Sequence, residues 1–118
     1  MIEANDLDLP DLLKNNMKIF VVFYEQANPN SQTVIDTVTE IANESSLPIA
    51  KIEISTNTAM VNYYNVKKTP AAILFYNRAP IVAVMGLYDK DLSSLLFQPY
   101  INVVGDETIK NLQDNPPA

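Results

Sequence analysis

The stretch KIFVVFYEQANPNSQTVIDTVTEIA, residues Lys18–Ala42, decides how the rest of the chain is interpreted. It begins with a continuous apolar run, Ile19–Tyr24, which predicts a strand that is covered on both faces. A short polar loop follows this strand. Beyond the loop, apolar residues recur at the spacing that gives a helix one buried stripe, at Val34, Ile35, Val38, Ile41 and Ala42. The segment therefore predicts a buried strand that leads directly to the N-terminus of an exposed helix.

The ends of this helix are predicted from polar and proline residues. Asn28 is expected to be the N-cap, because its side chain can accept a hydrogen bond from the first helical turn. Pro29 would then be the first helical residue, where a missing N–H removes no hydrogen bond. The polar and proline residues of Ser45–Pro48 should end the helix.

The remaining elements alternate between strands and helices, and they close with a hairpin and a final helix. This order predicts an α/β fold, in which a central mixed sheet of four to five strands carries helices on both faces. The predicted strands are Ile2–Asn5, Met17–Phe23, Ile49–Ile54, Ala71–Tyr76 and Ile81–Met85, and the shorter predicted helices are Leu9–Asn15 and Thr58–Tyr64.

Two details are predicted in the C-terminal half. Residues Asn77–Pro80 should join the last two strands, and the lack of a glycine there argues against a tight two-residue primed turn. Asp89 should cap the last helix, on which Leu92, Leu95 and Leu96 share one face.

The domain boundary is placed near the end of that helix. Pro99 should end or kink the helix, so we assign residues 1–101 to one domain and residues 102–118 to a C-terminal extension. A weak apolar pair predicts a short helix at Asp106–Gln113 within the extension. We expect the extension to contribute contacts to other proteins.

Composition restricts the partners of the chain. With a net charge of −6 and only eight basic residues among 118, it lacks the clustered Lys and Arg that bind phosphates, so no nucleic-acid partner is expected. No apolar run reaches the roughly 18–20 residues of a membrane-spanning helix. The acidic N-terminus lacks the basic start of a signal peptide. We expect no membrane partner, and a location in the cytoplasm or in a larger assembly such as a virion.

The chain contains neither cysteine nor histidine. This excludes thiol redox chemistry, imidazole bases, the Ser-His-Asp arrangement and zinc sites of the Cys/His kind. No EF-hand loop occurs, and the only glycines, Gly86 and Gly105, form no phosphate-binding loop. We therefore expect no metal, no cofactor and no catalytic residue.

Three segments of the chain resemble thioredoxins: FYEQANPNSQTVIDTVTEIA, AKIEI, and VKKTPAAILFYN followed by IVAVMGL. The resemblance runs from about Leu9 to Ile101 and implies a thioredoxin-like fold. It also implies that the Thr69-Pro70 bond is cis and faces the start of the main helix, and that Gly86 ends the last strand.

The same resemblance identifies what has been replaced. Asn28 and Ser31 stand where thioredoxins have the two cysteines of Trp-Cys-Gly-Pro-Cys, with Pro29-Asn30 between them and Ala27 in place of the Trp. Thiol–disulfide exchange requires a thiolate that attacks a disulfide sulfur. Neither Asn nor Ser can supply one, so this activity is excluded.

Three further positions follow from the resemblance. Tyr24 stands where the family has an inner Trp, and Val22 replaces a buried Asp that assists proton transfer. Lys51 matches the family's Lys near that Asp. Without a histidine, only a lysine such as Lys51 could activate Ser31, and this would require contact between the two side chains. The simpler interpretation is that Asn28 and Ser31 satisfy N–H groups of the first helical turn.

We hypothesise a non-catalytic protein that acts through protein–protein contacts, as a structural, assembly or scaffold component, for example of a virus or phage particle. The alternative is a peptide-binding or chaperone-like module, in which an extended peptide pairs with the backbone of the residue before the cis-proline. Against this stands the interpretation that the proline only shapes its loop. The predicted contact residues are Ala27, Asn28, Pro29, Asn30, Ser31, Lys68, Thr69, Pro70 and Gly86.

Overall fold

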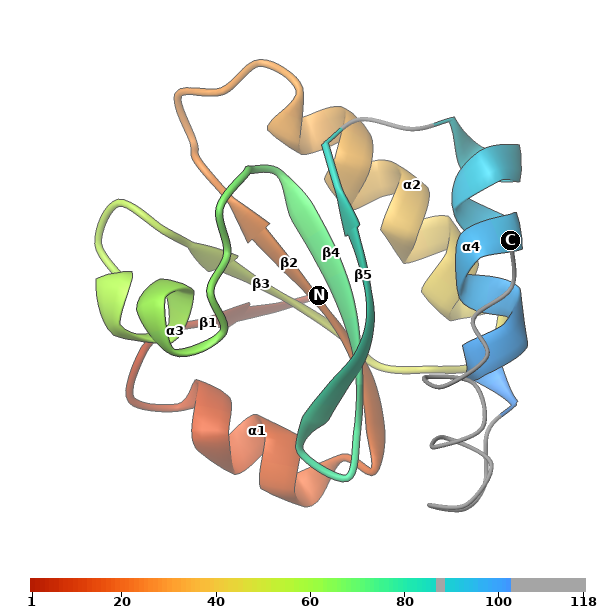
Figure 1. The fold of residues 1–118 in the computed structure, drawn as a ribbon, viewed down its shortest axis with the longest axis horizontal. Coiled ribbons are helices and arrows are strands. Elements are labelled where there is room, and N and C mark those ends of the chain that lie inside the picture. The colour runs from red at the N-terminus through yellow and green to blue at the C-terminus, as the bar shows by residue number, and fades with distance from the viewer. Residues whose placement is uncertain (87–88, 103–118) are drawn as a thin grey trace.

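The chain folds into a five-stranded sheet with helices on both faces (Figure 1). The computed structural model describes residues 1–86 and 89–102. In chain order the elements are β1 (Ile2–Ala4), α1 (Leu9–Asn15), β2 (Lys18–Tyr24), α2 (Ser31–Glu44), β3 (Ile49–Glu53), α3 (Thr58–Tyr63), β4 (Ala71–Tyr76), β5 (Ala79–Met85) and α4 (Lys90–Ile101).

The sheet is mixed, as the order of elements predicts. Its strand order is β1-β3-β2-β4-β5. The first three strands of that order run parallel, whereas β4 is antiparallel to both β2 and β5. Figure 1 shows α1 and α3 on one side of the sheet and α2 and α4 on the other. The predicted helix at Asp106–Gln113 lies outside the described residues.

Strand β2 forms the centre of the core. Every residue of Ile19–Phe23 is fully inaccessible to solvent, which confirms the strand with two covered faces. Because successive side chains of a strand point to opposite faces, the strand contributes to two clusters. Phe20, Val22 and Tyr24 pack with α2 and α4, and Ile19, Val21 and Phe23 pack with α1 and α3.

The hairpin between β4 and β5 differs from its prediction. Tyr76 pairs directly with Ala79, so Asn77 and Arg78 alone form the turn. Both residues have positive φ angles, 49° and 69°, as a two-residue primed turn requires. The prediction against a tight two-residue primed turn, which was based on the lack of glycine, is therefore wrong. Asn tolerates this conformation well, and the pairing of two strands offsets its cost at Arg78.

The last helix is capped as predicted but buries a different face. The Asp89 side chain accepts a hydrogen bond from the Leu92 N–H at 2.8 Å. Leu92, Leu95 and Leu96 share a face, but 40–70% of each is exposed. The helix instead buries Ser93, Phe97, Tyr100 and Ile101. It also continues through Pro99 to Ile101, so this proline does not end it at once.

Phe97 anchors α4 to the centre of the sheet. Its ring lies edge-to-face on Phe20 of β2, with 5.1 Å between ring centroids, and both side chains are fully buried. We expect Phe97→Ala to lower the free energy of unfolding by about 3–5 kcal/mol, because it leaves a cavity beside β2. Leu95→Ala, on the exposed side of the same helix, should change it by less than about 0.5 kcal/mol. Urea denaturation of both variants tests the assignment, and equal losses would contradict it.

Candidate functional site

The cis-proline and the start of α2 lie together. The Thr69-Pro70 peptide bond is cis, as the resemblance implies. The Asn28 side-chain amide donates to the Thr69 carbonyl at 3.5 Å, and the Thr69 hydroxyl donates to the Glu25 carboxylate at 3.2 Å. The structure therefore brings residues 28–31 and 69–70, far apart in the sequence, into one corner of the molecule. We call these residues, with Gly86, the cis-proline corner.

Helix α2 begins later than predicted. Its first residue is Ser31, and Asn30 occupies the N-cap position without a capping side-chain bond. The Asn28 side-chain oxygen instead accepts the N–H of Asn30 at 2.9 Å, and the Asn28 carbonyl accepts the N–H of Ser31 at 3.1 Å. The expectations for Asn28 as N-cap and Pro29 as first helical residue are therefore wrong. Asn28 forms a turn just before the helix, a use of this side chain that competes with capping.

Ser31 is buried, with 4% of its surface exposed. Its hydroxyl donates to the Glu25 carbonyl at 2.7 Å, so it does not accept from the first helical turn as predicted. The hydroxyl proton is thus engaged by a backbone oxygen. Lys51, the candidate base, is paired with Glu3 instead.

Gly86, directly after β5, forms a backbone hydrogen bond with the cis-proline. Its N–H donates to the Pro70 carbonyl at 2.9 Å, and its φ of +91° is one that side-chain-bearing residues rarely adopt. A Cβ atom at this position would lie 3.5 Å from the Lys68 side chain. The glycine is therefore required chiefly by the backbone conformation, and it ends β5 as predicted.

The predicted contact residues divide into an exposed rim and a buried base. Two further residues, Asn28 and Thr69, are half-buried. Only these two and the exposed rim are open to a partner in this structure. Ala27, Pro29, Asn30 and Lys68 are exposed, Asn28 and Thr69 are half-buried, and Ser31, Pro70 and Gly86 are buried.

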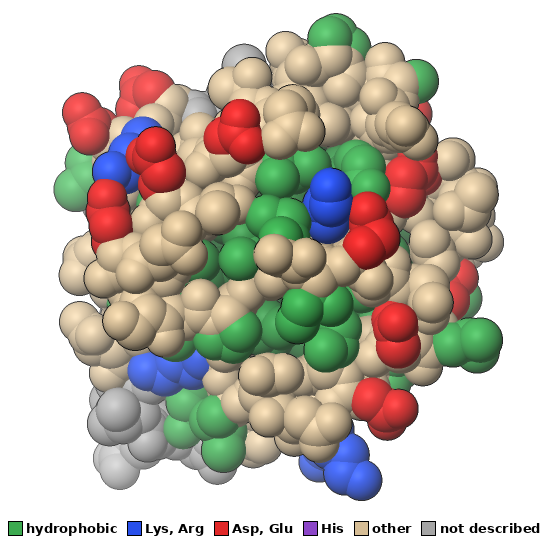
Figure 2. Space-filling model, turned by 180° about the vertical axis from the view of Figure 1, so that it is seen from behind, with side chains coloured by type: hydrophobic (Ala, Val, Ile, Leu, Met, Phe, Trp, Pro, Cys, Tyr) green, Lys and Arg blue, Asp and Glu red, His purple; other side chains and the backbone are tan. Residues whose placement is uncertain are grey.

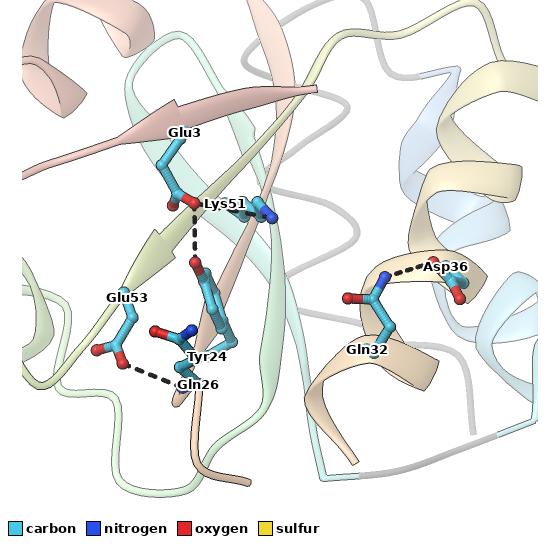
Figure 3. A network of polar contacts seen from close by, with 7 residues as sticks. All are labelled: Glu3, Tyr24, Gln26, Gln32, Asp36, Lys51 and Glu53. Carbon is cyan, nitrogen blue, oxygen red and sulfur yellow. Dashed lines mark hydrogen bonds and ion pairs between the residues drawn. The ribbon is translucent and has the colours of Figure 1, made fainter. Parts of the chain in front are cut away.

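A polar cluster that the sequence did not reveal lies beside this corner (Figure 3). The Tyr24 hydroxyl donates to the Glu3 carboxylate at 2.8 Å, and the Lys51 ammonium lies 3.7 Å from the same carboxylate. Lys51 also lies 5.4 Å from the centre of the Tyr24 ring. Glu3 and Lys51 are register partners on β1 and β3, so only the parallel pairing of these strands could have identified the contact.

The cluster and the corner share a cleft of about 440 Å³. Its walls are mainly polar and include Glu3, Tyr24, Gln26, Asn28, Gln32 and Lys51. The Gln26 N–H donates to the Glu53 carboxylate at 3.0 Å, which keeps the loop after β2 close to β3 (Figure 3).

Tyr24 is the most strongly perturbed titratable group of this cleft. Burial, followed by the hydrogen bond to Glu3 and the negative charges of Glu3 and Glu53, raises the pKa of its hydroxyl to about 12. The phenol therefore stays protonated at neutral pH and acts as a hydrogen-bond donor.

Comparisons with known proteins agree with the fold described above. The chain is 29% identical over 92 residues to a bifunctional thioredoxin reductase/thioredoxin of Mycobacterium leprae, an alignment that covers 75% of the chain and 20% of that protein. A thioredoxin variant from Halobacterium salinarum NRC-1 superposes with a TM-score of 0.77 at 25% identity and covers 88% of this chain and 93% of its own. Thioredoxin f2 of Chlamydomonas reinhardtii gives 0.73 at 14% identity, over 87% and 99%. No protein-family model matches the chain.

The chain has a thioredoxin-like fold. It spans about a fifth of the length of the curated relative that it matches. Asn28 and Ser31, which the sequence resemblance places at the positions of the two thioredoxin cysteines, both form hydrogen bonds. Val22, at the position of the buried Asp, is fully inaccessible to solvent and packs in the core.

Two kinds of feature, a membrane-spanning helix and a cluster of metal ligands, are not found in the described part of the chain. No helix in residues 1–86 and 89–102 is long and apolar enough to cross a membrane. In the same residues, no group of three or more carboxylates is placed to hold a metal ion.

The raised pKa of Tyr24 predicts a pH dependence. An unfolded tyrosine ionises near pH 10, whereas the folded chain keeps this proton up to about pH 12. The contribution of Tyr24 to stability is therefore complete below pH 10 and should be lost as the pH rises towards 12. The difference between the ultraviolet titration curves of the protein and of Tyr24→Phe gives the ionisation of this phenol. Glu3→Gln should lower its pKa while burial keeps it above the ordinary value; no change in the titration would contradict the role of Glu3.

The retained turn predicts that sulfur can be restored. The Ser31 N–H bonds back to the Asn28 carbonyl, so the two Cα atoms lie within the roughly 7 Å of a β-turn, close to the range that a disulfide spans. We expect the double variant Asn28→Cys with Ser31→Cys to form an intramolecular disulfide under mild oxidation. Thiol titration should then find no free thiol, whereas each single variant keeps one. A folded double variant that retains both thiols would show that the thioredoxin geometry is not preserved here.

Proposed function

We propose that this protein is a non-catalytic protein-binding module whose contact surface is the cis-proline corner. One observation carries the proposal. The corner keeps its geometry, with Thr69-Pro70 bonded through Asn28 and Gly86, although the chain has no cysteine that could use it. A scaffold that retains the surface but lacks the sulfur chemistry is suited to binding.

The proposed mode of binding is strand addition. Thr69 is half-buried at the edge of the corner, and the exposed side chains of Ala27, Pro29, Asn30 and Lys68 surround the approach to it. An extended peptide would pair with the backbone before the cis-proline, and its side chains would contact this rim. Lys68 would favour a peptide that carries an acidic residue near the point of pairing.

The absence of catalysis is part of the proposal. Thiol–disulfide exchange is excluded because it requires a thiolate. The remaining hydroxyl of the corner, on Ser31, is buried and donates to a backbone carbonyl. Lys51 is held by Glu3, so neither side chain supports a Ser–Lys mechanism in this arrangement.

A structural or assembly role remains the alternative form of the same binding function. It depends on the C-terminal extension, of which residues 103–118 lie outside the described part of the chain. Deletion of residues 102–118 should abolish assembly if the extension provides the contacts. The same deletion should leave peptide binding intact if the cis-proline corner provides them.

Peptide binding can be tested with a display library of unstructured 12-residue peptides selected on the unmodified protein. Thr69→Pro removes the backbone N–H that strand addition would use, so we expect selected peptides to bind at least tenfold more weakly. Thr58→Pro is the matched control, since Thr58 is the first residue of α3, where proline is tolerated. Titration calorimetry gives both affinities, and unchanged affinity for Thr69→Pro would reject the corner.

A second measurement does not depend on the folding of a variant. Amide chemical shifts of the unmodified protein, followed during peptide titration, should change at Asn28, Asn30, Ser31 and Thr69. Changes confined to the opposite side of the sheet would contradict the proposal.

A further inference from the structure

Strand β5 lies at one end of the sheet and pairs with β4 on one side only. Among the described residues, no strand pairs with its other edge. In an edge strand, about every second N–H and C=O group points outward and is free to pair with another chain. Figure 1 shows β5 running along the outside of β4, beside α4.

This edge lacks most of the protection that edge strands usually carry. The strand reads APIVAVM and contains no charged residue. Pro80 and the register shift between Leu74 and Phe75, which leaves Ile81 without a partner on β4, interrupt pairing at the turn end of the strand. Residues Val82–Met85, beyond this bulge, therefore form an uncharged, proline-free edge, the kind that pairs readily with another strand.

Helix α4 extends the apolar surface next to this edge. Lys90 contacts Glu40 and Glu44 of α2, which identifies the side of α4 that faces α2. With 100° per residue, Leu92 and Leu96 lie about 160° and about 120° around the helix from Lys90, on the side away from α2. They are 41% and 40% exposed, and α4 packs against β5 as well as α2. The two leucines therefore border the open edge of β5.

We propose that two copies of this protein pair through β5, with Leu92 and Leu96 packing across the contact. An antiparallel arrangement about Ala83 places Val82 of each copy opposite Val84 of the other, so the regular part of the strand is complementary to itself. The result is a symmetric contact that joins two five-stranded sheets into one.

The charge distribution favours a second copy over a charged partner. The net charge of −6 would oppose self-association if acidic groups lay in the contact. The β5 strand carries none, and Figure 2, the view from behind, shows acidic side chains spread over the face turned away from the viewer in Figure 1. An uncharged strand offers a basic or acidic partner no electrostatic complement.

The size of the contact predicts a weak dimer. Seven strand residues span about 23 Å, and the 12 residues of α4 span about 18 Å. A strand edge with two flanking leucines is small beside the roughly 800 Å² per partner of a standard stable interface. We therefore expect dissociation in the micromolar range, with monomers at high dilution.

Sedimentation velocity of the full chain over a concentration series tests the proposal. Ala83 and Ala59 are both exposed, so each accepts a lysine without disturbing the core. Ala83→Lys places two like charges side by side at the symmetry axis and should raise the dimer dissociation constant at least tenfold. Ala59→Lys, on α3, adds the same charge and should leave it unchanged. A monomer at all concentrations up to the millimolar range, or equal effects of both variants, would overturn the proposal.

A second measurement locates the contact. The chain has no cysteine, so a single introduced thiol is a clean reporter. Ala83→Cys should be cross-linked into a covalent dimer by a short bismaleimide, whereas Ala59→Cys should not. Cross-linking of Ala59→Cys alone would place the contact on α3 and reject β5. Peptide binding at the cis-proline corner should persist in Ala83→Lys, so the two proposals fail separately.

Discussion

The complete burial of β2 is the constraint on which the rest of the structure depends. A strand with five fully inaccessible residues, Ile19–Phe23, must have a strand on each side and helices on both faces. This fixes where the chain leaves the sheet after Tyr24, and hence where α2 can begin. The cis-proline reaches the same place because β4 is the antiparallel neighbour of β2. The geometry of the corner thus follows from packing in the core, and it requires no sulfur.

This separation of scaffold and chemistry explains how a thioredoxin-like chain can lack cysteine. Asn28 and Ser31 do not leave unpaired polar groups at the cis-proline corner, since each forms hydrogen bonds with neighbouring backbone. Val22 adds apolar contact to the core where a buried carboxylate would have to be desolvated. The three positions are therefore each compatible with a stable fold. In the proposed function, these residues keep the surface around them without a reactive sulfur.

The elements and their order could be predicted because they depend on local patterns, such as the apolar period of α2 and the uninterrupted run of β2. The failures concern non-local effects. Strand pairing, which no local rule includes, makes the left-handed conformations of Asn77-Arg78 acceptable. On α4, two apolar stripes compete, and the aromatic stripe with Phe97 wins because Phe20 offers an edge-to-face partner. The contact of Glu3 with Lys51 required the register of β1 against β3.

Gly86 connects the two surfaces proposed to bind partners. It ends β5, and its N–H holds Pro70 in the cis-proline corner. With Ala83 at the symmetry axis, Met85 of one copy lies beside the Ile81 bulge of the other. The Gly86 residues of the two corners would then lie on either side of the axis, about 20 Å apart along the strands. A dimer of this form presents two separate binding sites, so a partner with repeated segments would be held more tightly than its affinity for a single corner predicts.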